Sequence, residues 1–368
     1  MPKIIVSVSN DLSTDQRLKK VCETLQKSGF EIVLVGRKLP NSMALVRSYQ
    51  TIRINNFFNK GFLFYAEFNL RLFFKLMKLN GDILLSNDLD TLLPNYIVSK
   101  LNTNKLVYDS HEIFTEVPEL NNRPFVKRFW LKLEQRLLPR LTFMYTVNSQ
   151  LAHYFSNKYH IPVDIVLNVP NRIDQIHSDQ SFVDKVKAGK KMLIIQGRGL
   201  NIDRGLEESV LMMKYLDGCI LYIIGDGDVI SKIRKMIKDQ ELQDKVILLP
   251  TMNYDELIKY TSIADLGLTL DKPTCLNYEW SLPNKLFDYI QCRVPILASN
   301  RKLVSEIVLK HDIGMVVNSF DPEYLSTQVS HIFANEKLSQ QWRANLEKIA
   351  PNYTWENQEK KLVQIFTS

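Results

Sequence analysis

Short apolar runs alternate with longer stretches of helical spacing along most of the chain. In the first half, apolar runs that fit buried strands lie at residues 3–8, 31–35, 83–86, 106–109, 143–147 and 164–167. Stretches with helical periodicity lie between most of them, for example at residues 15–27, 92–100 and 149–158. Buried strands that alternate with helices predict a parallel sheet that is covered by helices on both faces.

The second half repeats the same pattern. Strands fit at residues 192–196, 220–224, 246–249, 266–270, 295–298 and 315–317. Helices fit at residues 206–216, 229–238, 254–261, 285–291 and 322–333. The polar residues 168–191 between the halves, with Pro170 and Gly189, are typical of a connector. The pattern therefore predicts two doubly wound α/β domains, in which ligands bind beyond the carboxyl ends of the strands.

A chain of 368 residues is long enough for two domains with full cores. We expect an N-terminal domain at residues 1–170 and a second domain at residues 171–350. A final helix at residues 351–368 would pack back on the N-terminal domain. The two domains are expected to face each other across a central cleft.

Cysteine spacing and the lengths of the apolar runs indicate the compartment in which the protein works. The four cysteines are scattered and show no metal-binding spacing, so we expect reduced thiols and no disulfide framework. The sequence has no secretion-signal core and no uncharged apolar run of spanning length. These features predict a cytoplasmic protein without a metal site.

The net charge of +7 is unevenly distributed. Residues 1–170 hold 22 Lys and Arg against 14 Asp and Glu, whereas the remainder holds 25 against 26. The basic excess indicates an anionic partner of the first half, either a membrane surface or a phosphorylated acceptor. A solvated basic surface is the alternative.

Two segments of the first half combine cations with aromatic residues. Residues 123–141 carry six cations and one acid, with apolar residues at helical spacing between them. Residues 57–79 add further aromatics together with Arg71, Lys75 and Lys78. This pattern is typical of helices that bind a membrane surface. The alternative is that both are domain helices whose apolar faces belong to the core.

The segment IIQGRGLNIDRGLEES at residues 194–209 places two arginines after a predicted strand. Gly197 and Gly205 let the backbone approach a ligand, and the following helix offers free N–H groups. Arg198 and Arg204 supply planar donors suited to phosphate, so the segment favours diphosphate binding. A surface turn with two solvated arginines is the alternative. In YIIGDGDV at residues 222–229, Gly225 and Gly227 fit either a nucleotide pocket or a plain tight turn.

The segment SLPNKLFDYIQCRVPILAS at residues 281–299 is the most specific. Pro283 precedes Asn284 and Lys285, which open a helix and bring a lysine together with free N–H groups. Asp288 shares a helix face with Lys285 and could accept hydrogen bonds from ribose hydroxyls. The alternative is a surface ion pair between Lys285 and Asp288.

In the first half, LVYDSHEIFTEV ends a strand at Asp109 and presents His111 and Glu112 in a loop. A histidine beside two carboxylates suits hydrogen bonding to sugar hydroxyls or proton transfer, and a structural histidine is the alternative. In SNDLDTLLP, Asp88 or Asp90 is expected to cap a helix.

Taken in order, these segments resemble the family-four glycosyltransferases of the GT-B fold, specifically bacterial polysaccharide and lipopolysaccharide members. The opening SNDLSTDQRLKKVCETLQKSGFEIVLVG, the segments described above, VILLPTMNYDELIKYTSIADLGL and the closing YTWENQEKKLVQIF follow in family order. The resemblance implies two Rossmann-like domains, a nucleotide-sugar in the second domain and an acceptor in the first. It also implies retention of anomeric configuration and no metal or other cofactor.

The resemblance also assigns roles to residues. It implies that Arg198, Arg204 and Lys285 hold the donor diphosphate, that Asp288 holds the ribose, and that His111 contacts the donor sugar. The family often has two glutamates seven residues apart, but here Asp288 is the later one and Trp280 occupies the earlier position. Glu279 lies one place away.

The acceptor side is less defined by the motifs. Many family members have a glycine-rich first loop, whereas no glycine occurs here before Gly29. The absence of these glycines excludes a GxGxxG dinucleotide site at the first turn. The candidates for acceptor handling are Asn10, Asp11, Asp15, Arg17 and Glu112.

The expected activity is transfer of a sugar from a nucleotide-sugar to a saccharide or lipid-linked acceptor, peripheral to the inner face of the cytoplasmic membrane. A sugar-nucleotide epimerase on the same scaffold is an alternative, because His111 with Glu112 could move protons. A non-catalytic nucleotide-binding protein is another. A nucleic-acid-binding protein would fit the pI near 9.0, but the sequence has no recognised nucleic-acid motif.

Overall fold

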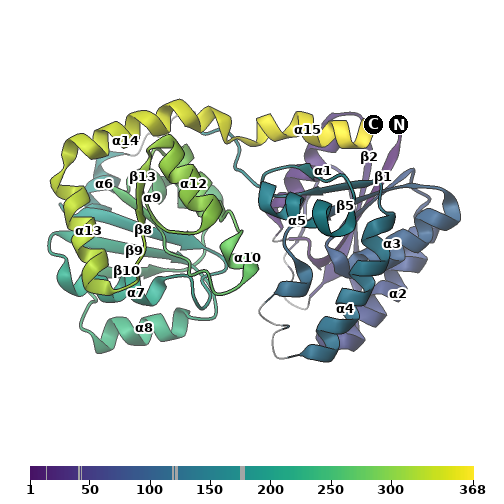
Figure 1. The fold of residues 1–368 in the computed structure, drawn as a ribbon, viewed down its shortest axis with the longest axis horizontal. Helices are drawn as coiled ribbons and strands as arrows, with labels where there is room; N and C mark the ends of the chain where they lie inside the picture. Colours follow the sequence, from purple (N-terminus) through teal and green to yellow (C-terminus); the bar gives the residue numbers. More distant parts are fainter. Residues whose placement is uncertain (14, 40–41, 43, 118–119, 121–122, 175–178) are drawn as a thin grey trace. The chain divides into compact units, whose positions relative to one another are not determined.

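The computed structural model describes residues 1–13, 15–39, 42, 44–117, 120, 123–174 and 179–368. Contacts divide the chain into two units (Figure 1). Unit 1 comprises Met1–Asn168 together with Gln358–Ser368, and unit 2 comprises Val169–Asn357. None of the described helices combines the length and the apolar character needed to cross a membrane.

Unit 1 is built on a seven-stranded sheet in the order β3-β2-β1-β4-β5-β6-β7, and all neighbours are parallel. The strands are β1 (Lys3–Asp11), β2 (Glu31–Lys38), β3 (Gln50–Asn55), β4 (Ile83–Asn87), β5 (Lys105–Ser110), β6 (Phe143–Thr146) and β7 (Asp164–Ile165). The helices are α1 (Gln16–Lys27), α2 (Gly61–Leu79), α3 (Leu89–Asn102), α4 (Pro124–Leu137), α5 (Ser149–Tyr159) and α15 (Trp355–Thr367), which belongs to unit 1 from Gln358 on.

Unit 2 is built on a six-stranded parallel sheet in the order β10-β9-β8-β11-β12-β13. The strands are β8 (Lys191–Gly197), β9 (Cys219–Gly225), β10 (Val246–Leu249), β11 (Leu266–Thr269), β12 (Ile296–Ser299) and β13 (Gly314–Val317). The helices are α6 (Gln180–Lys187), α7 (Leu206–Met212), α8 (Ile230–Asp239), α9 (Tyr254–Ser262), α10 (Leu276–Glu279), α11 (Asn284–Gln291), α12 (Lys302–His311), α13 (Pro322–Ala334) and α14 (Glu336–Ile349). The prediction of two doubly wound α/β domains is confirmed.

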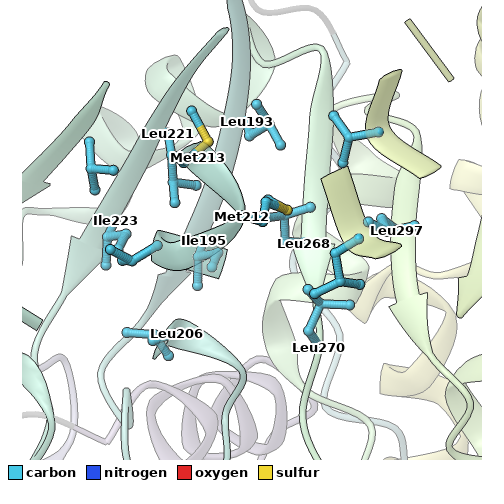
Figure 2. Close-up of a cluster of buried hydrophobic side chains, with 14 of the residues drawn as sticks. Leu193, Ile195, Leu206, Met212, Met213, Leu221, Ile223, Leu268, Leu270 and Leu297 are labelled. Atoms are coloured by element: carbon cyan, nitrogen blue, oxygen red, sulfur yellow. The ribbon is translucent and has the colours of Figure 1, made fainter. Parts of the chain in front are cut away.

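Apolar side chains from strands and helices form the core of unit 2. Figure 2 shows Leu193 and Ile195 of β8 with Leu221 and Ile223 of β9, and they belong to one cluster with Met212 of α7. Burial of apolar surface of this kind contributes about 25 cal/mol per Å². In unit 1 the buried stripe of α2 packs in one cluster with Ile5 of β1 and with Val33 and Val35 of β2.

Each sheet has a point where the strand order reverses. In unit 1 it lies between β1 and β4, and in unit 2 it lies between β8 and β11. Loops that leave neighbouring strands at such a point run to opposite faces of the sheet, which opens a crevice at the carboxyl ends. The candidate segments that follow β8 and β4 therefore lie where a doubly wound sheet binds ligands.

Glycines let the loops after β8 and β9 lie against each other. Gly225 has φ of 146°, and a Cβ atom added to it would overlap the carbonyl group of Gly197. A Cβ atom on Gly227 would overlap the carbonyl group of Leu200. The two loops are also joined by the N–H of Asp226, which donates to the Gly197 oxygen at 3.2 Å. These glycines are therefore required by backbone packing.

We predict that Gly225→Ala destabilises the protein by at least about 1–3 kcal/mol, because the methyl group would force the two loops apart. Gly199→Ala in the loop after β8 is the matched control, since no atom lies within 4 Å of a Cβ atom there. Chemical denaturation followed by circular dichroism measures both variants. Equal denaturation midpoints for the two would contradict the proposed constraint.

Candidate functional site

The carboxylate of Asp271 collects three cations at the carboxyl ends of β8, β11 and β12. Asp271 is fully buried two residues after β11. Arg204 Nη1 lies 3.2 Å from its Oδ2, Lys285 Nζ lies 3.1 Å from its Oδ1, and Arg301 Nη2 lies 3.1 Å from its Oδ2. We call these four residues the Asp271 cluster.

The cluster holds more positive than negative charge. Burial opposes ionisation of Asp271, but the charges of Lys285, Arg301 and Arg204 outweigh it and lower the pKa of this carboxyl. Burial lowers the pKa of Lys285, and the attraction of Asp271 does not fully offset that effect. One carboxylate against three cations leaves two charges uncompensated. A buried cluster of this kind attracts an anionic ligand.

The position of Arg204 is set by the turn that precedes α7. Gly205 has φ of 73°, and a Cβ atom on it would overlap the backbone of Leu270, so this turn lies directly against the end of β11. The guanidinium of Arg204 lies 4.0 Å from the ring centroid of Tyr278. Its buried Nε atom has no hydrogen-bond partner among the described residues.

Arg301 links the cluster to the segment that leads into α11. It is fully buried, and its Nη1 donates to the carbonyl oxygen of Tyr278 at 2.6 Å and to Ser281 Oγ at 2.8 Å. The same guanidinium contacts Asp271 through Nη2. Arg301 thereby fixes the loop before Lys285 relative to the end of β11.

Asp271 and Arg301 were not among the residues predicted from the sequence. Asp271 lies two residues after β11, and Arg301 lies two residues after β12. The rule applied to the other strands, that polar residues just beyond a carboxyl end are candidates, would have found both. Their pairing joins segments that are 30 residues apart, which no local pattern reveals.

The first turn of α11 carries Lys285 and Asp288. Both side chains are buried, so the alternative of a surface pair is wrong. Asp288 accepts hydrogen bonds from Gln196 Nε2 and from Tyr254 Oη, each at 2.8 Å. Asn284, the first residue of α11, is exposed. Lys285 and Asp288 therefore line two adjacent polar positions, one cationic and one anionic.

The other donor-side candidates lie around this cluster. Arg198 is exposed in the loop after β8 and is not part of the Asp271 cluster. Glu279 ends α10, and its Oε1 accepts a hydrogen bond from the N–H of Lys302 at 3.2 Å. Gly197 ends β8, where it packs against Gly225. The structure thus brings Arg204 and Lys285 together, and leaves Arg198 outside.

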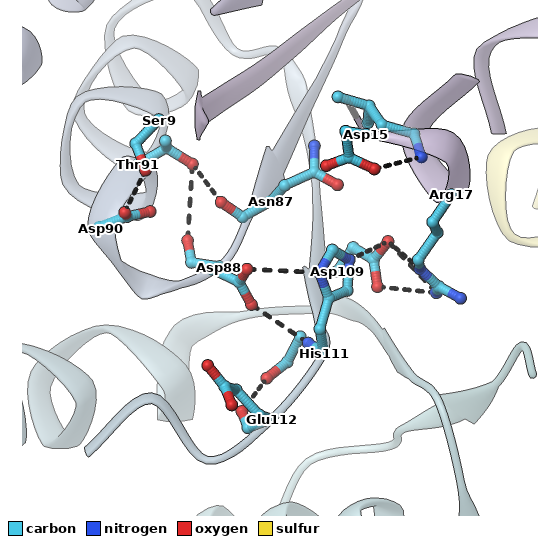
Figure 3. Close-up of polar contacts among 12 residues, drawn as sticks. Ser9, Asp15, Arg17, Asn87, Asp88, Asp90, Thr91, Asp109, His111 and Glu112 are labelled. Atoms are coloured by element: carbon cyan, nitrogen blue, oxygen red, sulfur yellow. Dashed lines mark hydrogen bonds and ion pairs between the residues drawn. The ribbon is translucent and has the colours of Figure 1, made fainter. Parts of the chain in front are cut away.

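In unit 1, His111 lies between two carboxylates (Figure 3). Its Nδ1 is 3.3 Å from Asp88 Oδ2, and its Nε2 is 3.1 Å from Asp109 Oδ2. The backbone N–H of His111 also donates to Asp88 Oδ1 at 3.1 Å. Neighbouring strands β4 and β5 end at Asn87 and Ser110, which brings the two loops together.

The carboxylates favour the protonated form of His111. Burial opposes protonation, but Asp88 and Asp109 outweigh it and raise the pKa of His111 well above its usual range. Burial likewise opposes ionisation of Asp109, yet Arg17 and His111 lower its pKa to about 2. Burial, with the charge of Asp88, raises the pKa of Asp90 to about 7.

The expected capping role of Asp88 is wrong. Asp88 stands at the N-terminal cap of α3, but its side chain makes no capping hydrogen bond there and turns to His111. Its backbone has φ of 57° and ψ of 168°, a conformation that costs on the order of 1–3 kcal/mol. Asp90, in the first turn, is buried and accepts a hydrogen bond from Ser9.

The acceptor-side candidates have different environments. Arg17 is buried, and its Nη2 lies 3.1 Å from Asp109 Oδ1. Asp15 caps α1 by accepting the N–H of Leu18 at 2.9 Å. Asn10 and Glu112 are exposed. Asp11 accepts a hydrogen bond from Ser42 at 2.5 Å. Arg17 thus joins the cluster around His111 through Asp109.

Comparisons with known proteins identify the family and the fold that the chain resembles. Residues 178–349 match the family model described as "Glycosyl transferases group 1". The chain is 28% identical over 131 residues to chitobiosyldiphosphodolichol beta-mannosyltransferase of Mus musculus, a match that covers 35% of this chain. The chain spans only 26% of the length of that protein.

Two solved structures share the fold over the whole chain. Anabaena Alr3699/HepE in complex with UDP-glucose aligns with a TM-score of 0.76 and 14% identity, and covers 100% of both chains. WaaG, a glycosyltransferase involved in lipopolysaccharide biosynthesis, aligns with a TM-score of 0.72 and 13% identity over 99% of this chain and 100% of that chain. The chain has the GT-B fold, and its resemblance to family-four glycosyltransferases is confirmed.

We predict that His111 stays protonated at neutral pH and titrates above the ordinary histidine pKa of about 6.5. Because its pKa is raised in the folded state, its stabilisation is complete below about 6.5 and is lost as pH rises through the folded-state pKa. NMR titration of the imidazole resonances measures this. His311, whose pKa is lowered by burial and by Lys310, is the internal comparison. In the Asp88→Asn variant the pKa of His111 should fall. A His111 that titrates at or below the ordinary value in the unaltered protein would contradict the prediction.

Proposed function

We propose that this chain, whose residues 178–349 match the group 1 glycosyl transferases, is a retaining, metal-independent glycosyltransferase. It would move a sugar from a nucleotide-sugar donor to a saccharide or lipid-linked acceptor in cell-surface polysaccharide biosynthesis. The observation that carries the proposal is the Asp271 cluster, which holds two uncompensated positive charges at the switch point of the second sheet. A nucleoside diphosphate brings negative charge of matching magnitude.

The chemistry follows from that charge. When the anomeric bond breaks, negative charge develops on the departing diphosphate, and donors fixed in advance stabilise it. Arg204 and Lys285 are the donors within the cluster, and Arg198 lies on the preceding loop. Asp271 and Arg301 would position these donors. The two positive charges that Asp271 leaves uncompensated could offset a diphosphate as a divalent metal does in other phosphate sites, which supports a metal-independent reaction.

The remaining donor contacts are assigned by position. Asp288 accepts hydrogen bonds from two neutral groups, Gln196 and Tyr254, and its carboxylate remains able to accept further bonds from ribose hydroxyls. Glu279 and Asn284 lie on either side of the loop that leads to Lys285 and are proposed donor-side residues. Gly197, Gly225 and Gly227 keep the loop backbone close to the strand ends, where it can approach the nucleotide.

His111 is proposed to act on the sugar as a hydrogen-bond donor. Its two ring nitrogens face Asp88 and Asp109, which raise its pKa, so a contact with the sugar would have to share or replace one of these ion pairs, and the ring is poorly suited to accept a proton. This state favours contact with sugar hydroxyls or with developing negative charge. It disfavours the epimerase alternative, in which a histidine would have to accept a proton. Retention itself rests on the family resemblance, which implies front-face displacement.

The acceptor and the location rest on relatives and on charge. The mouse relative is named for a diphosphodolichol substrate, and the WaaG structure is titled for lipopolysaccharide biosynthesis. The basic excess of residues 1–170 fits an anionic acceptor or surface. We therefore propose a cytoplasmic enzyme that is peripheral to the inner face of the cytoplasmic membrane. Asn10, Asp15, Arg17 and Glu112 are its proposed acceptor-side residues.

We expect one of UDP, GDP, dTDP and CMP to raise the thermal unfolding midpoint, because a ligand of the native state stabilises it. Lys285→Met should weaken the binding of that nucleotide. It should also slow transfer from the matching sugar donor by a factor of roughly 10²–10³. Arg198→Ala should also weaken binding. Lys310→Ala, an exposed lysine on the neighbouring helix, is the control. The proposal fails if no nucleotide shifts the midpoint, or if Lys285→Met matches the control.

We expect His111→Ala to slow sugar transfer at saturating donor while leaving the affinity for the free nucleoside diphosphate nearly unchanged. The reason is that His111 belongs to unit 1, whereas the proposed diphosphate site belongs to unit 2. Turnover and calorimetric affinity are compared for the same variant. Loss of nucleotide affinity with normal saturated turnover would show that the assigned role is wrong.

A further inference from the structure

Helix α2 carries two apolar stripes on opposite sides. One stripe is buried against the sheet and consists of Phe64, Phe68, Leu72 and Leu76. The other stripe is exposed and consists of Leu63, Leu70, Phe74 and Met77. These residues recur at intervals of seven, four and three, so they lie on one face of the helix. A helix that only covers a sheet needs one such stripe, whereas the second stripe stays exposed.

Helix α4 presents aromatic rings and cations on its outward face. Phe125 is 83% exposed and Phe129 is also exposed, and Arg128, Lys132 and Arg136 are exposed on the same face by helical spacing. The single acid of this helix, Glu134, is buried instead, where it accepts hydrogen bonds from Tyr159 and Lys158. The outward face of α4 therefore carries positive charge and apolar surface without a carboxylate.

Aromatic ring contacts join the two helices, which both belong to unit 1 (Figure 1). The rings of Phe62 and Phe129 are in edge contact, with centroids 6.1 Å apart, and behind them Tyr65 contacts Trp130 at 5.2 Å. We call the exposed stripe of α2, the outward face of α4 and the turn before α2 the aromatic–cationic face.

The turn before α2 holds an aromatic ring out in solvent. Phe57 is 83% exposed, and the Glu67 carboxylate accepts the N–H groups of Phe57 and Phe58, both at 3.0 Å. Arg71 pairs with Glu67 at 2.8 Å, and its guanidinium lies 5.3 Å from the Phe57 ring centroid. Hydrogen bonds thus fix the turn in a form that keeps the ring exposed.

The chemistry of this face selects a lipid surface over other partners. Aliphatic residues such as Leu70 and Met77 gain nothing from a nucleic acid, which would use the cations alone. A second copy of the chain would set like charges against each other. An anionic bilayer takes both parts, because rings enter the boundary below the headgroups while cations meet the phosphates.

We propose that the aromatic–cationic face docks on an anionic lipid bilayer, with Phe57 and Phe125 inserted below the headgroups. Docking would bring a lipid-linked acceptor to the protein, and this purpose rests on the proposed function. The docking itself does not, since it needs neither donor nor turnover.

Co-sedimentation tests the proposal with the full chain and two kinds of vesicle, phosphatidylcholine alone and an equal mixture of phosphatidylcholine and phosphatidylglycerol. Binding should require phosphatidylglycerol and fall as salt is added. Each cation near the surface contributes about fivefold, so a triple variant of Arg128, Lys132 and Arg136 to Gln should weaken partitioning on the order of a hundredfold. The single variants Phe57→Ser and Phe125→Ser should each weaken partitioning to the mixed vesicles about tenfold. Both rings are exposed, so neither change removes core packing.

Matched controls separate the face from charge and exposure in general. Arg234, Lys235 and Lys238 are three exposed cations of α8 in unit 2, and their triple change to Gln should leave binding intact. Leu309→Ser, at a 63% exposed position of unit 2, is the apolar control. Insertion is followed by the emission of Phe125→Trp, which should shift to the blue with mixed vesicles only.

Three outcomes overturn the docking proposal. One is equal recovery in the supernatant with both kinds of vesicle at low salt. Another is equal loss of binding in the α4 and α8 triple variants. A chain that binds single-stranded RNA but neither vesicle is a nucleic-acid binder and also overturns it. A chain that docks but binds no nucleotide leaves docking intact and removes the proposed function, so the two failures are distinguishable.

Discussion

The candidate donor site depends on one buried carboxylate, Asp271. Without it, Arg204, Lys285 and Arg301 would repel one another in a space from which water is largely excluded, and loss of a buried ionic partner costs about 3–5 kcal/mol. With it, the cations lie together but are only partly neutralised. Burial is the main cause of the lowered pKa of Lys285, and the charges of Arg204 and Arg301 add to it. A bound anion would relieve this excess, so the same arrangement that limits the stability of the free protein favours the ligand.

Unit 1 contains a comparable cluster in which carboxylates, and not cations, are in excess around the central group. There, Asp88 and Asp109 outnumber His111 until Arg17 is included, and the four groups form a chain of ion pairs. Both clusters lie where the strand order of their sheet reverses, because only there do adjacent loops diverge and leave polar groups room at the strand ends. The strained backbone of Asp88 fits this account, since the turn of its side chain to His111 replaces an ordinary helix cap.

The sequence allowed the sheets to be predicted because their central strands are continuous apolar runs. It did not reveal β3 (Gln50–Asn55), an edge strand in which polar and apolar residues alternate, nor α12 and α14. Of the site, Lys285 and Arg204 were found because glycine, proline and cations cluster locally around them. Asp271 and Arg301 act through partners distant in sequence, and a single charged residue after a strand gives no sign of how many cations surround it. The cap predicted at Asp88 failed because propensity describes isolated turns, whereas a neighbouring strand end supplied a stronger partner.

The apolar residues of α2 also show what sequence alone cannot decide and what the structure adds. From sequence alone, a helix rich in aromatic and aliphatic residues fits either a core element or a surface-binding element. The structure separates the residues by face: Phe68 and Leu72 are fully buried, whereas Leu70 and Phe74 are more than half exposed. The two interpretations are therefore not exclusive, because one stripe anchors the helix to the sheet and the other remains outside. A rigidly anchored helix loses little conformational freedom on binding, so its exposed stripe can contribute most of its burial energy to a partner. The packing of the inner stripe against the sheet therefore allows the outer stripe to contribute to binding.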